Sequence, residues 1–384
     1  MLEIRTPYTH SVCPFLTEQM VFFDIETTGL SAKSSILYLI GIIKKEQNHW
    51  TVIQLFNDDG ESESEVILRF FQLFPKEAVL IHYNGTTFDL PYLKTRCELL
   101  HLSSDPLTFA TQFDYYSFLK PFKSLLQLSD CKQHTMEKIT GFERTDTLSG
   151  KKLIEQYFLH LKLQKDCYKE ALLLHNFDDL TGLIRLSYFI FFKEQLKQPL
   201  CFWDTVVSSD EIQFQLPLSS KFPDDFLEEV SFTKQFDPAA LKKKKREEST
   251  NLFTIKFTVT KELFFIACPI LNDTLKFFYP NYRDYFYLPL EDMAIHKSVA
   301  SFVDKDHRIK AKPDTCYTKK TGYFLPVFPP FSSFEEHSIP IFYKDYPFKQ
   351  GWILFDPSAS PLTQQLWLEN IFQYFKLPTP YLDH

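Results

Sequence analysis

Hydrophobic residues in the first half of the chain fall into short runs that alternate between strand-like and helix-like spacing. Five runs have the length and the β-branched or aromatic content of strands: residues 20–25, 36–44, 50–56, 78–83 and 109–115. Three segments have helical spacing, residues 66–74, 151–163 and 169–195, and a further helix is expected from about Pro91. Ser62 and Glu65 form a capping-box pattern before the first of them. This order of strands and helices predicts an α/β domain over residues 1–200.

The pattern changes after Pro199. Short aromatic strands such as residues 252–259 and 263–269 are separated by proline-rich turns, and a helix is expected over residues 362–375. We therefore predict a second domain, β-rich or α+β, over residues 201–384. Residues 242–246 (KKKKR) form a charge run in an expected loop.

Composition and the cysteine pattern indicate the cellular compartment that we expect. Hydrophobic residues make up 44% and charged residues 24%, which is ordinary for a globular protein. No apolar run reaches the ~18 residues of a membrane span, the first thirty residues lack a signal-peptide core, and the seven cysteines contain no C-x-x-C pair. A cytoplasmic protein without a membrane partner is the expectation.

The charge balance limits how this chain could bind nucleic acid. Its 42 basic and 49 acidic residues give a net charge of −7, which excludes a globally basic nucleic-acid coat. Binding to phosphates would need a local patch or bound metal cations.

Acidic residues at the end of the first predicted strand are the first candidate site. Asp24 and Glu26 are two apart, so both side chains point to the same side of the sheet while Ile25 faces the other layer. Two adjacent carboxylates repel each other unless a cation lies between them, and a divalent cation is the usual solution. The alternative is a solvated strand end.

Two further segments carry candidate acids. The fourth strand runs into Asn84-Gly85, and Asp89 follows in the turn before a helix; the alternative is an ordinary turn with Asp89 as helix N-cap. In the last long helix, His175 and Asp179 share one face at spacing i, i+4. Asp178 is expected to point elsewhere, toward solvent. The alternative for the His–Asp pair is packing without chemistry.

Together the three segments resemble the DEDD superfamily of 3′→5′ exonucleases. The resemblance rests on D-x-E within residues 23–30 (FDIETTGL), N-x3-F-D ending at Asp89, and H-x3-D ending at Asp179, and it covers about residues 15–195. Within the superfamily, residues 175–179 (HNFDD) and the SGKK segment at Ser149 resemble YprB-like bacterial proteins. The resemblance implies an RNase-H-like fold with a mixed sheet flanked by helices.

The resemblance also implies roles for individual residues. Asp24, Glu26, Asp89 and Asp179 would bind two divalent metal ions, Mg²⁺ or Mn²⁺, and His175 would be the general base. The x3 spacing places His175 where other members carry a tyrosine, since a histidine base usually has x4 spacing. The residues near the terminal nucleotide would be Thr28, Leu30, Asn84 and Phe88.

The function that follows is metal-dependent 3′→5′ exonuclease activity on single-stranded DNA or RNA ends. The alternatives are an endonuclease or RNase H on the same fold, and a catalytically silent nucleic-acid-binding scaffold. The second domain is expected to add nucleic-acid affinity, because it holds basic residues among aromatic ones. The candidate contacts are Arg308, Lys310, Lys312, Lys319 and Lys320, with residues 242–246 as a second set. Core aromatics with solvated lysines are the alternative.

Overall fold

The chain forms two compact units in this computed structural model, the first ending at Gln195 and the second formed by the described residues from Asp204 onward. The residues that the structure describes are 1–126, 128–146, 148–196, 204–208, 210–217, 229–236, 253–260, 262–347, 350–356 and 361–375. The basic run at 242–246 lies outside them.

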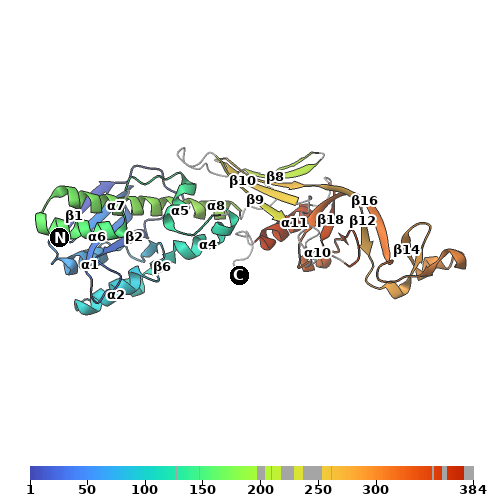
Figure 1. Cartoon of the computed structure of the whole chain (residues 1–384), viewed down its shortest axis with the longest axis horizontal. Helices are drawn as coiled ribbons and strands as arrows, with labels where there is room; N and C mark the ends of the chain where they lie inside the picture. The colour runs from blue at the N-terminus through green and yellow to red at the C-terminus, as the bar shows by residue number, and fades with distance from the viewer. Residues whose placement is uncertain are drawn as a thin grey trace. The chain divides into compact units, whose positions relative to one another are not determined.

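The first unit is built on a six-stranded sheet in the order β1-β4-β3-β2-β5-β6 (Figure 1). Its strands are β1 (Leu2–Pro7), β2 (Met20–Thr27), β3 (Leu37–Glu46), β4 (His49–Phe56), β5 (Val79–His82) and β6 (Thr111–Asp114). The sheet is mixed, because β1 to β4 pair antiparallel whereas β5 is parallel to both β2 and β6. β1 was not predicted, since it is an edge strand with exposed and half-buried residues and no continuous apolar run.

The helices of this unit follow the predicted order with two corrections. They are α1 (Glu63–Gln72), α2 (Asp89–Leu99), α3 (Asp105–Phe109), α4 (Tyr115–Leu125), α5 (Gln133–Glu137), α6 (Gly150–Leu163), α7 (Asp166–Arg185) and α8 (Tyr188–Leu196). The single helix predicted over residues 169–195 is wrong: α7 ends where the Ser187 hydroxyl donates to the Ile184 carbonyl at 2.6 Å. The capping box is also wrong, because the Ser62 hydroxyl donates to Asp59 instead of capping α1.

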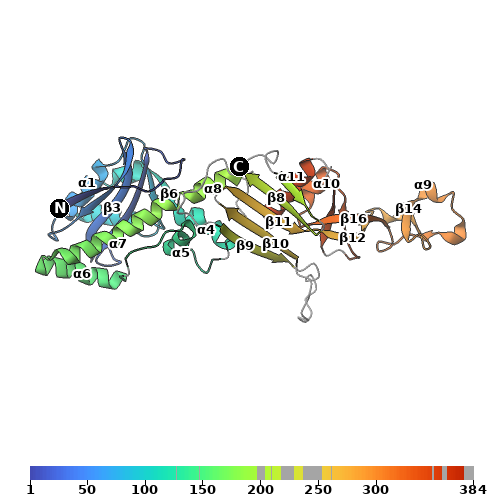
Figure 2. The ribbon, with the colours of Figure 1, turned by 90° about the horizontal axis from the view of Figure 1, so that it is seen from above.

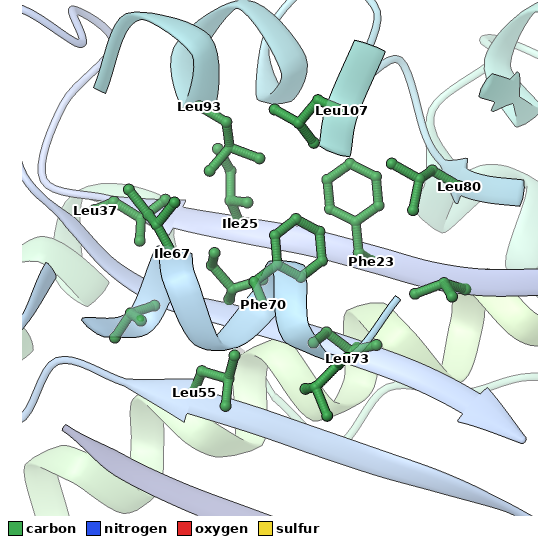
Figure 3. Close-up of a cluster of buried hydrophobic side chains, with 14 of the residues drawn as sticks. Phe23, Ile25, Leu37, Leu55, Ile67, Phe70, Leu73, Leu80, Leu93 and Leu107 are labelled. Carbon is green, nitrogen blue, oxygen red and sulfur yellow. The ribbon is translucent and has the colours of Figure 1, made fainter. Parts of the chain in front are cut away.

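Helices cover both faces of the sheet, which confirms the predicted α/β class. α1 and α2 pack on one face, where Phe23 and Ile25 of β2 join the main hydrophobic core (Figure 3). α6 and α7 run together along the other face (Figure 2). The alternation along β2 therefore directs Asp24 and Glu26 toward α7, as the strand period predicts.

The second unit consists of three antiparallel sheets and short helices, which confirms the predicted β-rich character of this half. The sheets have the orders β7-β8-β11-β10-β9, β12-β16-β18-β17 and β14-β13-β15. The strands are β7 (Asp204–Val207), β8 (Glu211–Pro217), β9 (Glu229–Phe236), β10 (Phe253–Thr260), β11 (Leu263–Pro269), β12 (Leu271–Phe278), β13 (Tyr285–Leu288), β14 (Met293–His296), β15 (Ile309–Lys310), β16 (Tyr317–Val327), β17 (Ile341–Phe342) and β18 (Gly351–Phe355). The helices are α9 (Lys297–Ala300), α10 (Ser332–Glu336) and α11 (Pro361–Tyr374).

None of the helices in the described part of the chain combines the length and apolar character needed to span a bilayer.

Candidate active site

The two carboxylates of β2 are held in place by side chains from neighbouring elements. The Asn176 amide on α7 donates to Asp24 Oδ2 at 3.2 Å, and the Tyr38 hydroxyl on β3 donates to Glu26 Oε2 at 3.2 Å. Tyr38 is itself fixed by stacking on Tyr157, with ring centroids 4.5 Å apart. Both positioning residues are buried, so each carboxylate has a defined orientation.

A glycine on β3 lets α7 approach the sheet closely enough for these contacts. A Cβ on Gly41 would lie only 2.1 Å from Asn176 Oδ1, so no larger residue fits unless the Asn176 side chain or the helix moves. Gln54 on β4 donates to the same Asn176 oxygen at 3.1 Å. Asn176 therefore connects Gln54 on β4 with Asp24 on β2. The sequence motifs did not identify Asn176 as functional.

α7 brings two predicted residues to Glu26. The imidazole Nε2 of His175 lies 3.5 Å from Glu26 Oε1 and 3.2 Å from Asp179 Oδ2. One candidate ligand atom from each of these three residues lies within 4.8 Å of the others. Residues separated by about 150 positions in the sequence thus form one cluster of two carboxylates and an imidazole.

Asp89, at the start of α2, belongs to the same electrostatic cluster. It is the first residue of α2 and not its N-cap, which is Phe88. Its carboxylate is 8% exposed and lies against the backbone N–H groups of Asp89 and Ile25. Asp89 contributes to the charge repulsion on both Asp24 and Glu26.

Burial and mutual repulsion disfavour the simultaneous ionisation of these acids. Burial, followed by the charges of Asp179, Glu26 and Asp89, raises the pKa of Asp24 well above its usual range. Burial raises the pKa of Glu26 to about 7 and that of Asp89 to about 7. Burial alone would lower the pKa of His175, but Glu26, Asp179 and Asp146 together raise it.

This donor set fits divalent cations. Carboxylate oxygens are the ligands that Mg²⁺ and Mn²⁺ prefer. Burial and neighbouring carboxylates raise the pKa values of Asp24, Glu26 and Asp89, although His175 acts in the opposite direction on Glu26. A bound cation would offset the repulsion among these carboxylates, and the residues that could hold it are Asp24, Glu26, Asp89 and Asp179.

A loop before α6 also reaches the cluster, and no sequence motif pointed to it. Asp146 Oδ2 lies 2.6 Å from His175 Nδ1, and Arg144 forms an ion pair of 2.6 Å with Asp179 Oδ1. Asp178 was expected to face solvent, and that expectation is wrong: it is 4% exposed and accepts hydrogen bonds from the backbone N–H groups of Thr145 and Asp146. The helical period predicts only that the Asp178 side chain points away from the face of His175 and Asp179. It does not predict that the loop before α6 covers that other side of α7.

The predicted substrate residues lie on loops around the site. Leu30 is 88% exposed, whereas Phe88 is partly buried against Tyr92. The Thr28 hydroxyl accepts from the Ile36 backbone N–H, and the Asn84 backbone N–H donates to Asp114. Leu30 is therefore the residue of this set whose side chain is most available to a ligand.

The basic candidates of the second unit differ in the contacts and exposure of their side chains. The Lys319 ammonium lies 2.8 Å from Asp292 Oδ2, and the Arg308 guanidinium donates to the Ala300 carbonyl. Lys310, Lys312 and Lys320 are exposed.

Comparison with known proteins places the first unit in a superfamily. Residues 21–190 match the family model RNase_H_2, described as RNase_H superfamily. This segment is therefore an RNase-H-like domain, which confirms the fold implied by the sequence motifs.

Similar proteins include one bacterial protein of the predicted group. The uncharacterized protein YprB of Bacillus subtilis is 28% identical over 193 residues, covering 47% of this chain and 43% of YprB. The PolC-type DNA polymerase III of Halalkalibacterium halodurans is 26% identical over 155 residues, covering 35% of this chain and 11% of the polymerase. This chain thus spans less than half the length of either relative.

Among solved structures, E. coli exonuclease I in complex with a dT13 oligonucleotide is similar to this chain at a TM-score of 0.31 and 11% identity. The similarity covers 55% of this chain and 54% of exonuclease I.

Proposed function

We propose that the first unit is a metal-dependent 3′→5′ exonuclease of the DEDD type, which hydrolyses phosphodiester bonds at single-stranded DNA or RNA ends. The observation that carries the proposal is the convergence of Glu26, His175 and Asp179 within 4.8 Å on an RNase-H-like fold. The half-buried Asp24 and the buried Asp89 share the same electrostatic environment. A scaffold that only binds nucleic acid has no need of a buried, self-repelling set of carboxylates.

The chemistry divides between the ligands and the imidazole. Two divalent cations held by Asp24, Glu26, Asp89 and Asp179 would activate a water and stabilise the leaving 3′-oxygen. His175 Nε2 faces the cluster, where it can accept the proton of the attacking water. Asn176 and Tyr38 keep Asp24 and Glu26 in the orientation that this geometry requires.

In this proposal the second unit supplies affinity for the nucleic acid. Exposed Lys310, Lys312 and Lys320 are available for phosphates, while Lys319 is engaged by Asp292. Contact with a single strand would release counterions, so affinity should fall with rising salt.

A 5′-labelled single strand tests the proposed activity. The full chain is incubated with labelled DNA and, separately, RNA in Mg²⁺ or Mn²⁺, and products are separated by length. A descending ladder is expected. The Asp24→Asn protein, purified in parallel, controls for a contaminating nuclease and should leave the substrate intact. Discrete internal cuts would replace the proposal with an endonuclease, and uncut substrate under all conditions would favour the silent scaffold.

A further inference from the structure

Three consecutive residues, Arg144 to Asp146, attach one loop to the catalytic face of α7. Arg144 pairs with Asp179, Asp146 contacts His175, and the backbone between them is bound by Asp178. All three partners lie within one and a half turns of the same helix. Two of them are the imidazole and a proposed metal ligand of the site.

Asp178 fixes the backbone of this loop. Its Oδ2 accepts from the backbone N–H of Thr145 at 2.6 Å and of Asp146 at 2.8 Å, and the Thr145 hydroxyl adds a bond of 3.0 Å to the same oxygen. A buried carboxylate is stable only when such donors surround it. Asp178 therefore fixes the position of the loop along α7 without contacting the ligand atoms of the cluster.

Asp146 sets the orientation of the His175 ring. One carboxylate oxygen lies 2.6 Å from His175 Nδ1, and the other accepts from the Leu148 backbone N–H at 3.0 Å. A carboxylate beside Nδ1 keeps a proton on that nitrogen, so in the neutral ring Nε2 is the nitrogen without a proton, and it faces Glu26 and Asp179. This is the tautomer that a general base acting through Nε2 needs.

Arg144 fixes one oxygen of Asp179 in the same way. Its guanidinium is held by Glu137, which is completely buried, through bonds of 2.7 and 2.9 Å. From there it pairs with Asp179 Oδ1, which leaves Oδ2 directed toward His175. The loop thus orients one oxygen of a ligand and one nitrogen of the base at the same time.

We propose that residues 144–146, fastened by Asp178, are a positioning device for the active site. Asp146 determines which nitrogen of His175 carries the proton. Arg144 pairs with Oδ1 of Asp179 and so determines that Oδ2 faces the cluster. The proposal rests on the proposed function for its catalytic consequence, but the geometry it asserts can be measured without cleavage.

Asp146→Asn is the sharpest test, because it preserves volume and reverses one hydrogen bond. The Leu148 N–H still requires an acceptor, so the new amide oxygen should stay there and the NH₂ group should face His175 Nδ1. That arrangement forces the proton onto Nε2. We expect kcat on the labelled single strand to fall by about 10²-fold or more, with KM and Mn²⁺ affinity near the wild-type values.

The tautomer itself is read by ¹⁵N NMR on metal-free protein labelled at histidine, at a pH high enough for the His175 ring to be neutral, with His175→Gln to assign the signal. Wild type should show the Nδ1–H form, and Asp146→Asn the Nε2–H form. A merely structural role for Asp146 would lower the melting temperature without inverting the tautomer.

Asp178→Ala provides a second variant that contacts neither the base nor a proposed ligand. It removes the oxygen that accepts the backbone N–H groups of Thr145 and Asp146, so both kcat and Mn²⁺ affinity should decrease, by roughly 10-fold each. Glu170→Gln, an exposed acid on the same helix, is the matched control and should behave as wild type.

The outcomes separate the two proposals. Wild-type kcat in Asp146→Asn together with an unchanged tautomer overturns the positioning device, as does wild-type behaviour of Asp178→Ala. Inability of the wild-type protein to cleave any strand overturns the proposed function instead. In that case the tautomer comparison alone still decides whether Asp146 positions His175.

Discussion

The stability of the metal-free protein should depend on the charge of Glu26. Burial, partly offset by His175, raises the pKa of Glu26 from 4.5 to about 7 in the folded protein. In the unfolded chain the group ionises near its ordinary value. The folded state therefore binds more protons between about pH 4.5 and 7, and the free energy of unfolding decreases as pH rises through that window.

The magnitude follows from the shift. The pKa difference of about 2.5, at 1.36 kcal/mol for each pKa unit, corresponds to about 3 kcal/mol. The free energy of unfolding should therefore be about 3 kcal/mol lower above pH 7 than below pH 4.5. Glu26→Gln removes the charge and keeps the shape, so it should stabilise the metal-free protein at pH 8 by up to about 3 kcal/mol. For a domain of this size that is a rise in melting temperature of roughly 6–12 °C. At pH 4.5 the advantage should vanish.

Scanning calorimetry in EDTA at pH 4.5 and pH 8 measures both values, with exposed Glu170→Gln as the control for a change of net charge alone. A second scan with Mn²⁺ reverses the ranking if Glu26 is a ligand. Binding at about 1,000 times Kd should add about 4.1 kcal/mol to the wild type and much less to Glu26→Gln. A variant no more stable than wild type at pH 8, or equally more stable at both pH values, would refute the electrostatic reasoning.

Four other predictions follow from the site and the second unit. Asp24→Asn should abolish cleavage while the melting temperature of the metal-free protein does not fall; near wild-type rates would argue against its role as a ligand. His175→Ala should lower the rate by about 10²–10⁴-fold with Mn²⁺ affinity retained in calorimetric titration, whereas equal loss of both would make it a ligand. Gly41→Ala, whose Cβ would lie 2.1 Å from Asn176 Oδ1, should destabilise the fold by about 1–3 kcal/mol and weaken Mn²⁺ binding, as denaturant titration and calorimetry would report. Lys320→Ala should reduce single-strand affinity and lower the salt slope by about 0.7 without changing kcat; an unchanged slope would remove this residue from the interface.

Periodicity within one element was sufficient to predict half of the candidate site. Alternation along a strand places Asp24 and Glu26 on one side and Ile25 on the other, and the helical repeat places His175 and Asp179 on one face. The order of strands and helices likewise predicted a mixed α/β domain. These properties depend on backbone geometry over a few residues, so a sequence is enough to state them.

What covers each face was decided only by tertiary packing. The helical repeat separates Asp178 from Asp179 but does not say that the 144–146 loop would bury Asp178 and bring Asp146 to His175. Gly41 and Asn176 become one contact because α7 packs closely on β3 at that point. Such pairings join residues from 29 to 135 positions apart, and their energies depend on shape and on the burial of polar groups. Sequence determined which residues share a face, and the packing of distant segments determined which of them are buried, charged and held in place.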